Sequence, residues 1–144
     1  MSGLTKIKIE DEKLPELEMG ITHIEDLMEI SIDHQNLEQV SEQLSNALNL
    51  LHTTGRLIEV ATRMYDYAKG VAVYQTAMNE QTKKLPTTLQ VKIVEGLICN
   101  QSGMYAKTDR VIKSLTSYIE GMRSILSSLK EERKSESYNR AQAE

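Results

Sequence analysis

Two heptad repeats of apolar residues, separated by a proline near the middle of the chain, most constrain how this sequence can fold. The first repeat occupies Leu37, Val40, Leu44, Ala47, Leu51, Thr54, Ile58, Ala61, Tyr65, Ala68 and Ala72. The second occupies Val91, Val94, Ile98, Gln101, Tyr105, Thr108, Ile112, Leu115, Ile119, Met122, Leu126 and Leu129. Residues three and four apart share one face of a helix. The sequence therefore predicts an all-α fold, in which two long helices form an antiparallel, coiled-coil-like hairpin.

The first long helix is expected over about 36–81. Asn36 followed three residues later by Gln39 is a helix start signal, in which the asparagine side chain caps the first free amides. Thr53 to Gly55 is a weak point, because two β-branched residues and a glycine lower helix propensity. The phase of the repeat does not shift there, however, which favours a continuous helix over a second turn.

The second long helix is expected over about 88–132, after the break that Pro86 imposes. Thr87 and Gln90 match the capping box, in which each side chain bonds the other residue's free amide. The apolar repeat stops near Lys130, and the last residues are polar and charged. We therefore expect the helical domain to end near 134 and residues 135–144 to form a polar tail.

The N-terminal part of the chain differs from the rest in charge and in pattern. Residues 1–52 carry three lysines and eleven acidic residues, a net charge of −8, whereas residues 53–144 carry a net charge of +4. Residues 1–21 lack a helical repeat and contain Pro15, which predicts an extended acidic arm. Thr22 to Glu25 then match a second capping box, so a short helix is expected over 22–31 and the helical domain over 22–134.

A third apolar position in each heptad predicts contacts beyond the hairpin. Three apolar positions in seven make a face that is too wide for a two-stranded seam and typical of a larger bundle. Another copy, the N-terminal helix or a foreign partner must cover this face, so the expected assembly is an oligomeric helical bundle. The predicted interface residues are Leu50, Leu57, Met64, Val71, Met78, Leu97, Met104, Val111, Tyr118 and Ile125.

The sequence offers no set of residues that converges on catalysis, a metal or a cofactor. His23, His34 and His52 lack the spacing of zinc or di-iron ligands, and we expect them at the surface. Cys99, the single cysteine, lies on an apolar stretch and is expected to be buried and inert. No apolar run is long enough to span a membrane, and no secretory signal is present, so a cytoplasmic location or a particle assembled there is expected.

One mixture of cations and aromatic residues suggests an alternative. Such mixtures can hold phosphates and stack the bases of single-stranded nucleic acid. The competing interpretation is that the tyrosines are structural and the cations are solvated. The candidate nucleic-acid contacts are Arg56, Arg63, Tyr67, Lys69, Lys83 and Lys84.

The function expected from the sequence is therefore structural and not enzymatic. The chain would oligomerise through its helical stripes and contact another protein as part of a larger complex, such as a phage virion or a secretion apparatus. A nucleic-acid-binding accessory protein and a small helical adaptor or chaperone are the alternatives. Nothing in the sequence identifies the particle or the number of copies.

Overall fold

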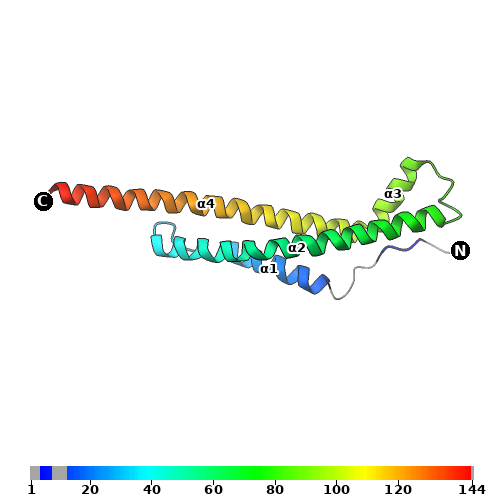
Figure 1. The fold of residues 1–144 in the computed structure, drawn as a ribbon, viewed down its shortest axis with the longest axis horizontal. Coiled ribbons are helices and arrows are strands. Elements are labelled where there is room, and N and C mark those ends of the chain that lie inside the picture. Colours follow the sequence, from blue (N-terminus) through cyan, green and yellow to red (C-terminus); the bar gives the residue numbers. More distant parts are fainter. Residues whose placement is uncertain (1–3, 8–12, 144) are drawn as a thin grey trace. The chain divides into compact units, whose positions relative to one another are not determined.

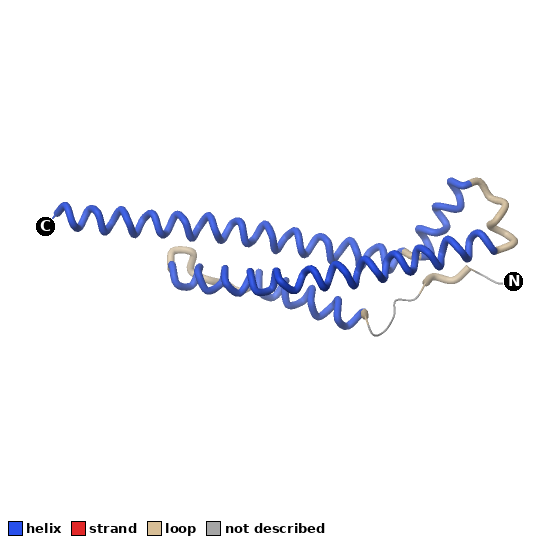
Figure 2. Tube along the Cα trace, viewed as in Figure 1, coloured by secondary structure: helices blue, strands red, loops and turns tan. Residues whose placement is uncertain are grey.

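A computed structural model describes residues 4–7 and 13–143 of the chain and shows four helices in these residues (Figure 1). They are α1 (Leu14–Glu29), α2 (Leu37–Met78), α3 (Thr87–Leu97) and α4 (Cys99–Ala143). The described residues contain no strand, and the connections between helices are short (Figure 2). The predicted all-α class is confirmed.

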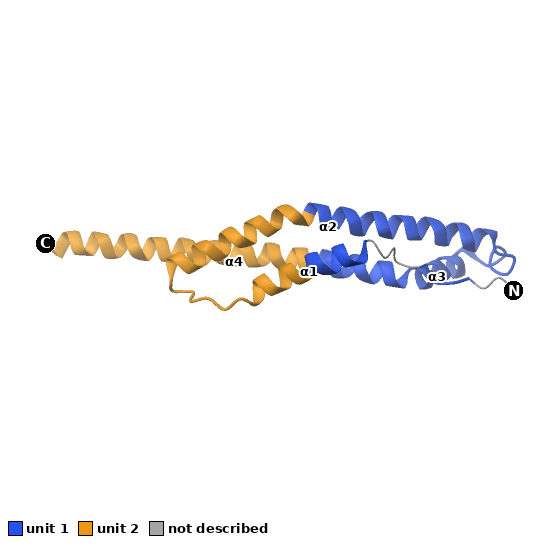
Figure 3. Ribbon diagram, turned by 90° about the horizontal axis from the view of Figure 1, so that it is seen from below, with its two compact units in different colours: residues 1–21, 55–110 blue, residues 22–54, 111–144 orange. Residues whose placement is uncertain are grey.

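The chain divides into two compact units, which are described separately (Figure 3). The first unit contains residues 1–21 and 55–110, and the second contains residues 22–54 and 111–144. In the second unit, parts of α1, α2 and α4 contribute the buried apolar residues Ile24, Leu27, Val40, Leu44, Ala47, Val111, Leu115, Ile119, Met122 and Leu129. Most of these belong to the two heptad repeats, because the residues of a repeat share one helix face.

The loop between α1 and α2 is held by side-chain hydrogen bonds to free backbone groups. The Asn36 side-chain oxygen accepts hydrogen bonds from the amides of Glu38 (3.0 Å) and Gln39 (3.1 Å). The Gln39 side-chain oxygen accepts one from the Asp33 amide at 2.9 Å, and the buried Gln43 side chain donates one to the Leu27 carbonyl at 2.8 Å. Asn36 therefore caps α2, as its position in the sequence predicts.

The first long helix is continuous through the weak point. The hydroxyls of Thr53 and Thr54 each donate a 2.7 Å hydrogen bond to the carbonyl three residues before, at Leu50 and Leu51. These bonds satisfy the hydroxyls within the helix, so the two threonines do not need a turn. The expected continuous helix is confirmed, and it ends at Met78, three residues before the expected end.

The expected start of the short helix at Thr22 is wrong, since α1 begins eight residues earlier, at Leu14. Proline is accepted in the first turn of a helix, so Pro15 does not prevent this start. Leu17, Ile21 and Ile24 lie on one face and are almost fully buried, which stabilises helix well upstream of the capping box. Residues 14–21 are therefore helical and do not belong to an extended arm.

The second long helix is interrupted at Ile98, which departs from helical geometry with φ −108° and ψ 16°. The Leu97 carbonyl before this break accepts a 2.9 Å hydrogen bond from the Ile7 amide, and the Gln101 side chain donates to the Ile7 carbonyl at 2.6 Å. Leu4 and Ile7 also pack on the apolar cluster beside the break. Residues 4–7 thus stabilise the break, which the heptad pattern alone does not reveal.

The boundaries of α3 and α4 also correct the expectations. Pro86 is the N-cap of α3, and no side chain caps this helix. The Gln90 side chain does not cap it but donates from Nε2 to the carbonyls of Thr82, Lys83 and Leu85, each at 3.1 Å. The α4 helix continues to Ala143, so residues 135–143 are helical. Five of these nine residues are good helix formers, which favours an exposed helix past the end of the apolar repeat: Glu136, Arg140, Ala141, Gln142 and Ala143.

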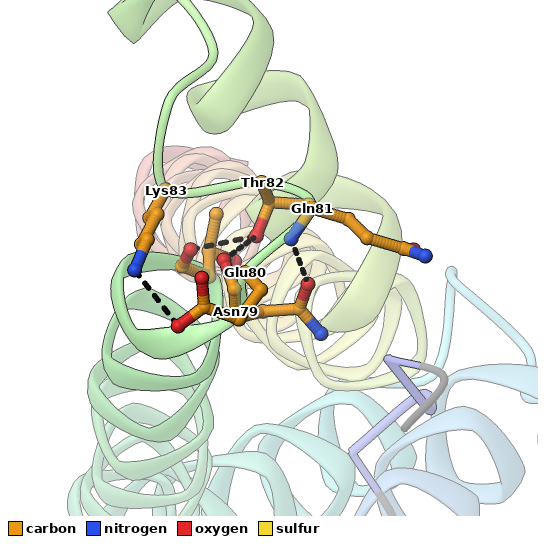
Figure 4. A network of polar contacts seen from close by, with 6 residues as sticks. Asn79, Glu80, Gln81, Thr82 and Lys83 are labelled. Carbon is orange, nitrogen blue, oxygen red and sulfur yellow. Dashed lines mark hydrogen bonds and ion pairs between the residues drawn. The ribbon is translucent and has the colours of Figure 1, made fainter. Parts of the chain in front are cut away.

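The turn between α2 and α3 is a compact polar network in the first unit (Figure 4). The Asn79 side chain accepts a hydrogen bond from the Gln81 amide at 2.9 Å, and the Thr82 hydroxyl donates to the Thr76 carbonyl at 2.7 Å. Lys83 and Glu80 form an ion pair at 2.8 Å. These bonds satisfy backbone groups that the end of α2 leaves free.

Candidate interaction surfaces

The residues predicted to contact partners lie in very different environments. Leu57, Met64, Leu97 and Val111 are buried within the chain, whereas Met78 is 63% exposed. The remaining predicted interface residues are half-buried: Leu50, Val71, Met104, Tyr118 and Ile125. Only part of the predicted interface is therefore accessible to another molecule.

The N-terminal helix α1 covers Leu57. This helix is one of the three possible coverings named from the sequence, together with another copy and a foreign partner. A Cβ atom added at Gly20 of α1 would lie 2.7 Å from Leu57 Cδ1 and 3.0 Å from Leu57 Cγ. A larger residue at that position would fit only if the Leu57 side chain moved. Nearby, Glu16 of α1 pairs with Arg56 of α2 at 2.9 Å. Leu57 thus belongs to the α1–α2 contact and is not free to bind a second chain.

The face of α2 that contacts α1 continues beyond it as a regular stripe. We call it the outer stripe; it consists of Val60, Met64, Tyr67, Val71, Tyr74 and Met78. The steps between its members alternate between four and three residues, so all six lie on one side of the helix. It is a different stripe from the heptad repeat that forms the core.

Burial changes abruptly within the outer stripe. Val60 and Met64 are buried, at 6% and 5% exposure, whereas Tyr67 and Tyr74 are each 64% exposed. The length of α1 explains this change. The chain reverses between α1 and α2, and α1 starts six residues before Gly20, so in an antiparallel register it reaches about six residues past Leu57, to the level of Arg63. Beyond Met64 the spacing of the stripe is unchanged, but Val71 is only half-buried and Tyr67, Tyr74 and Met78 are exposed.

A second apolar surface lies between α2 and α3, on another side of α2. It is a groove of about 380 Å³ in the first unit, and its walls include Val73 and Thr76 of α2 and Val91 and Val94 of α3. Val73 and Val91 are about half exposed. Lys69 of α2 also lines this groove. Sequence reasoning missed it, because it depends on the angle at which α3 leaves the turn.

The structure divides the candidate nucleic-acid residues between different surfaces. On a helical projection of 100° per residue, Arg56, Arg63 and Tyr67 share one side of α2, whereas Lys69 lies on the opposite side. Arg63 pairs with Glu59 at 2.7 Å, and Lys83 pairs with Glu80 in the turn. Lys83 and Lys84 follow the end of α2. The predicted band is therefore not one continuous cationic surface.

The pKa of Arg56 is raised above its ordinary value, first by its hydrogen bond to Glu16 and then by the attraction of that carboxylate. The guanidinium is fully exposed, so this pair adds little stability to the α1–α2 contact. For nucleic-acid binding, the pair means that Arg56, one of the six candidate contacts, already has a carboxylate partner in Glu16. The two arginines on this side of α2, Arg56 and Arg63, both have carboxylate partners.

Cys99 is exposed at the start of α4, so the expectation that it is buried is wrong. Ile98 belongs to the heptad repeat and is buried, whereas Cys99, the next residue, lies off that face of the helix. The described residues contain no group of three His, Cys, Asp or Glu side chains arranged to hold a metal. Within the same residues, no helix is both long and apolar enough to cross a membrane.

Comparisons with protein-family models, with curated proteins and with solved structures find no match. The chemistry of the chain's own surfaces is therefore the basis for assigning a role. Among these surfaces, the outer stripe has the most regular pattern.

Proposed function

We propose that this chain is a non-enzymatic assembly protein that associates with itself through exposed helical stripes. The observation that supports this role is the outer stripe, which is buried at Val60 and Met64, half-buried at Val71, and exposed at Tyr67, Tyr74 and Met78. Isolated exposed apolar residues are common on soluble proteins, but a run at heptad spacing is a pattern that helix–helix contacts need. A component of a larger particle, such as a phage virion or a secretion apparatus, fits this role.

The shape of the described helices supports the proposal in a second way. At 45 residues, α4 would be roughly 68 Å long at 1.5 Å per residue. Its last part, from Lys130 onward, is exposed on every side and carries charges of both signs. Such a helix contributes nothing to a core of its own chain, so we assign it to contacts with neighbours in the assembled complex. Assembly in the cytoplasm follows from this proposal.

Light scattering over a range of protein and salt concentrations tests the proposal. The expected result is a mass of at least two chains, which falls on dilution and persists at high salt, because apolar contacts are not screened. A mass of one chain at every concentration would contradict self-assembly and would favour a monomeric adaptor.

A nucleic-acid accessory role is the second candidate, and one observation favours it. Tyr67 and Tyr74 are highly exposed on the same side of α2 as Arg63, an arrangement that can stack bases beside phosphate contacts. Binding to single-stranded DNA should then weaken by about 0.7 log unit per phosphate contact for each tenfold increase in salt. Replacing Arg63 with alanine should reduce that slope, and absence of binding by the intact chain would exclude this role.

A further inference from the structure

We infer that residues 4–7 hold open the break between α3 and α4, and that these two helices join into one when residues 4–7 leave. The inference concerns the first unit and does not depend on the proposed self-assembly. In the described state α3 ends at Leu97, Ile98 has non-helical backbone angles, and α4 begins at Cys99. A joined helix would run from Thr87 through Ile98 into α4.

The docked and joined states compete for one backbone group, the Leu97 carbonyl. In the described state this carbonyl accepts a 2.9 Å hydrogen bond from the Ile7 amide. In a continuous α-helix it accepts the amide four residues later, which is that of Gln101. The helical bonds of Ile98 on either side are intact, since its amide donates at 3.1 Å and its carbonyl accepts at 2.9 Å. Residues 4–7 therefore occupy the acceptor at the point where the two helices fail to join.

The sequence around Ile98 favours a helix that continues. Val91, Val94, Ile98 and Gln101 follow one another at steps of three and four, so the heptad repeat keeps its phase across the break. No proline lies there, and Gly96, which lowers helix propensity, is itself helical in α3. Sharp breaks in helices also arise where another group enters the hydrogen-bond ladder. Here that group is the Ile7 amide.

The docked state is held by few contacts and opposed by one feature of the site. The Gln101 side chain donates from Nε2 to the Ile7 carbonyl at 2.6 Å, but its Oε1 atom is buried and has no hydrogen-bond partner among the described residues. A buried acceptor without a partner disfavours the state that contains it. Leu4 and Ile7 pack on the apolar cluster beside the break but are only partly buried. A contact of this kind is suited to reversible release.

The groove between α2 and α3 shows what joining would change. The α3 helix leaves the line of the first turns of α4 at an angle (Figure 1), and the groove lies between α3 and α2. Val94 and Ile98 are buried in the cluster that includes Ala72 of α2, whereas Val91, the preceding residue of the same repeat, is 49% exposed. In a joined helix Val91 would continue the stripe that packs on α2 and would cover Val73 on the opposite wall. Docking of residues 4–7 thus keeps the groove open, and their release closes it.

Hydrogen exchange of single amides, measured by NMR on the full chain, tests this inference by the sign of the change. Ile7→Asp places a carboxylate against the apolar cluster and should release residues 4–7. Thr5→Asp adds the same charge at an exposed residue of the same segment and is the matched control. The amides of Cys99 and Gln101 lie in the first turn of α4, where a helix leaves its amides without a partner of its own. In a joined helix both amides would be bonded.

The expected result is that these two amides exchange about tenfold more slowly in Ile7→Asp than in the wild-type chain, and at the wild-type rate in Thr5→Asp. If residues 4–7 only stabilise the existing structure, their loss would increase local opening and exchange would become faster. Unchanged or faster exchange of the Cys99 and Gln101 amides in Ile7→Asp would therefore overturn the inference.

A disulfide across the groove gives an independent readout. Val73→Cys and Val91→Cys are combined in a chain with Cys99→Ser, with and without Ile7→Asp. A disulfide requires Cα atoms within about 7 Å, so its rate of formation reports how often the two walls approach. The intramolecular disulfide, separated from dimer by non-reducing electrophoresis, should form about tenfold faster when Ile7→Asp is present. Equal rates in the two chains would overturn the closing of the groove.

Discussion

Gly20→Ala tests the contact between α1 and α2, which determines where the outer stripe becomes exposed. Alanine is more favourable than glycine in a helix interior by about 0.5–1 kcal/mol, so helix propensity alone predicts a gain in stability. The new Cβ would lie only 2.7 Å from Leu57 Cδ1, however, and 3.0 Å from Leu57 Cγ. Leu57 is nearly buried beside Val60 and Met64, which restricts its movement. Overpacking of this kind costs about 1–3 kcal/mol.

The matched control is Gly121→Ala on α4, where a Cβ would meet nothing within 4 Å. Both substitutions add one methyl group to a helix, so the difference between them isolates the contact with Leu57. We expect Gly121→Ala to stabilise the chain and Gly20→Ala to be less stable than Gly121→Ala by about 1–3 kcal/mol. The free energy of unfolding is measured by urea titration with far-UV circular dichroism, at one protein concentration for all variants.

Leu57→Ala provides the second half of the experiment. It removes the side chain that the new methyl group would meet, so Gly20→Ala made in that background should stabilise by about 0.5–1 kcal/mol. If Gly20→Ala in the otherwise unchanged chain stabilises as much as Gly121→Ala, α1 does not pack on Leu57. The explanation for the exposed part of the outer stripe would then be wrong.

Three further predictions concern the loops and the arm. Asn36→Ala removes the cap of α2 and should lower the free energy of unfolding by about 1 kcal/mol, whereas Thr22→Ala, in the interior of α1, should not lower it. Gln101→Met keeps the side-chain volume but removes the hydrogen bond to the Ile7 carbonyl. Trypsin should then cleave after Lys6 several times faster, as followed by mass spectrometry. An unchanged rate would show that this hydrogen bond does not hold residues 4–7 in place. Thr82→Val removes the hydroxyl that donates to the Thr76 carbonyl in the α2–α3 turn. The free energy of unfolding should fall by about 1 kcal/mol, which lowers the midpoint of thermal unfolding. An unchanged midpoint would show that this hydrogen bond contributes nothing to stability.

Much of the core of the second unit could be predicted from the sequence because it follows one helix period. Leu115 and Ile119 on α4 and Val40 and Ala47 on α2 all belong to the predicted repeats, and all are buried. The spacing of such residues is set by the geometry of the helix, which does not depend on what the helix contacts. Val91, also in the repeat, is exposed because α3 leaves the turn beside the groove.

Helix ends and breaks could not be predicted in the same way, since they depend on residues far away in the sequence. Thr22 to Glu25 has the pattern of a capping box, but burial of Leu17 extends α1 upstream of it. The interruption at Ile98 is accompanied by hydrogen bonds from Ile7 and Gln101, and no local signal reports the position of the arm. Tertiary contacts outweigh capping preferences of about 1 kcal/mol.

The start of α1 also affects how much of the predicted interface is accessible. Leu57 and Met64 were expected to be covered by another copy, the N-terminal helix or a foreign partner. With the start at Leu14, α1 packs on Leu57 through Gly20, Met64 is buried, and the exposed residues of the stripe are Tyr67, Tyr74 and Met78. Tyr74 is missing from the predicted interface because that prediction used one position in every seven residues, although the spacing of Tyr74 from Tyr67 and Met78 was available in the sequence.

Amide hydrogen exchange at increasing protein concentration tests the central claim most directly, because it measures association and its location together. The account predicts that exchange within Tyr67 to Met78 slows as concentration rises, as the contact between copies suppresses local opening of α2. Exchange in the exposed end of α4, around Tyr138, should be much less affected by this contact. Exchange within Tyr67 to Met78 that does not change with concentration, in samples whose mass shows association, would contradict assembly through the outer stripe.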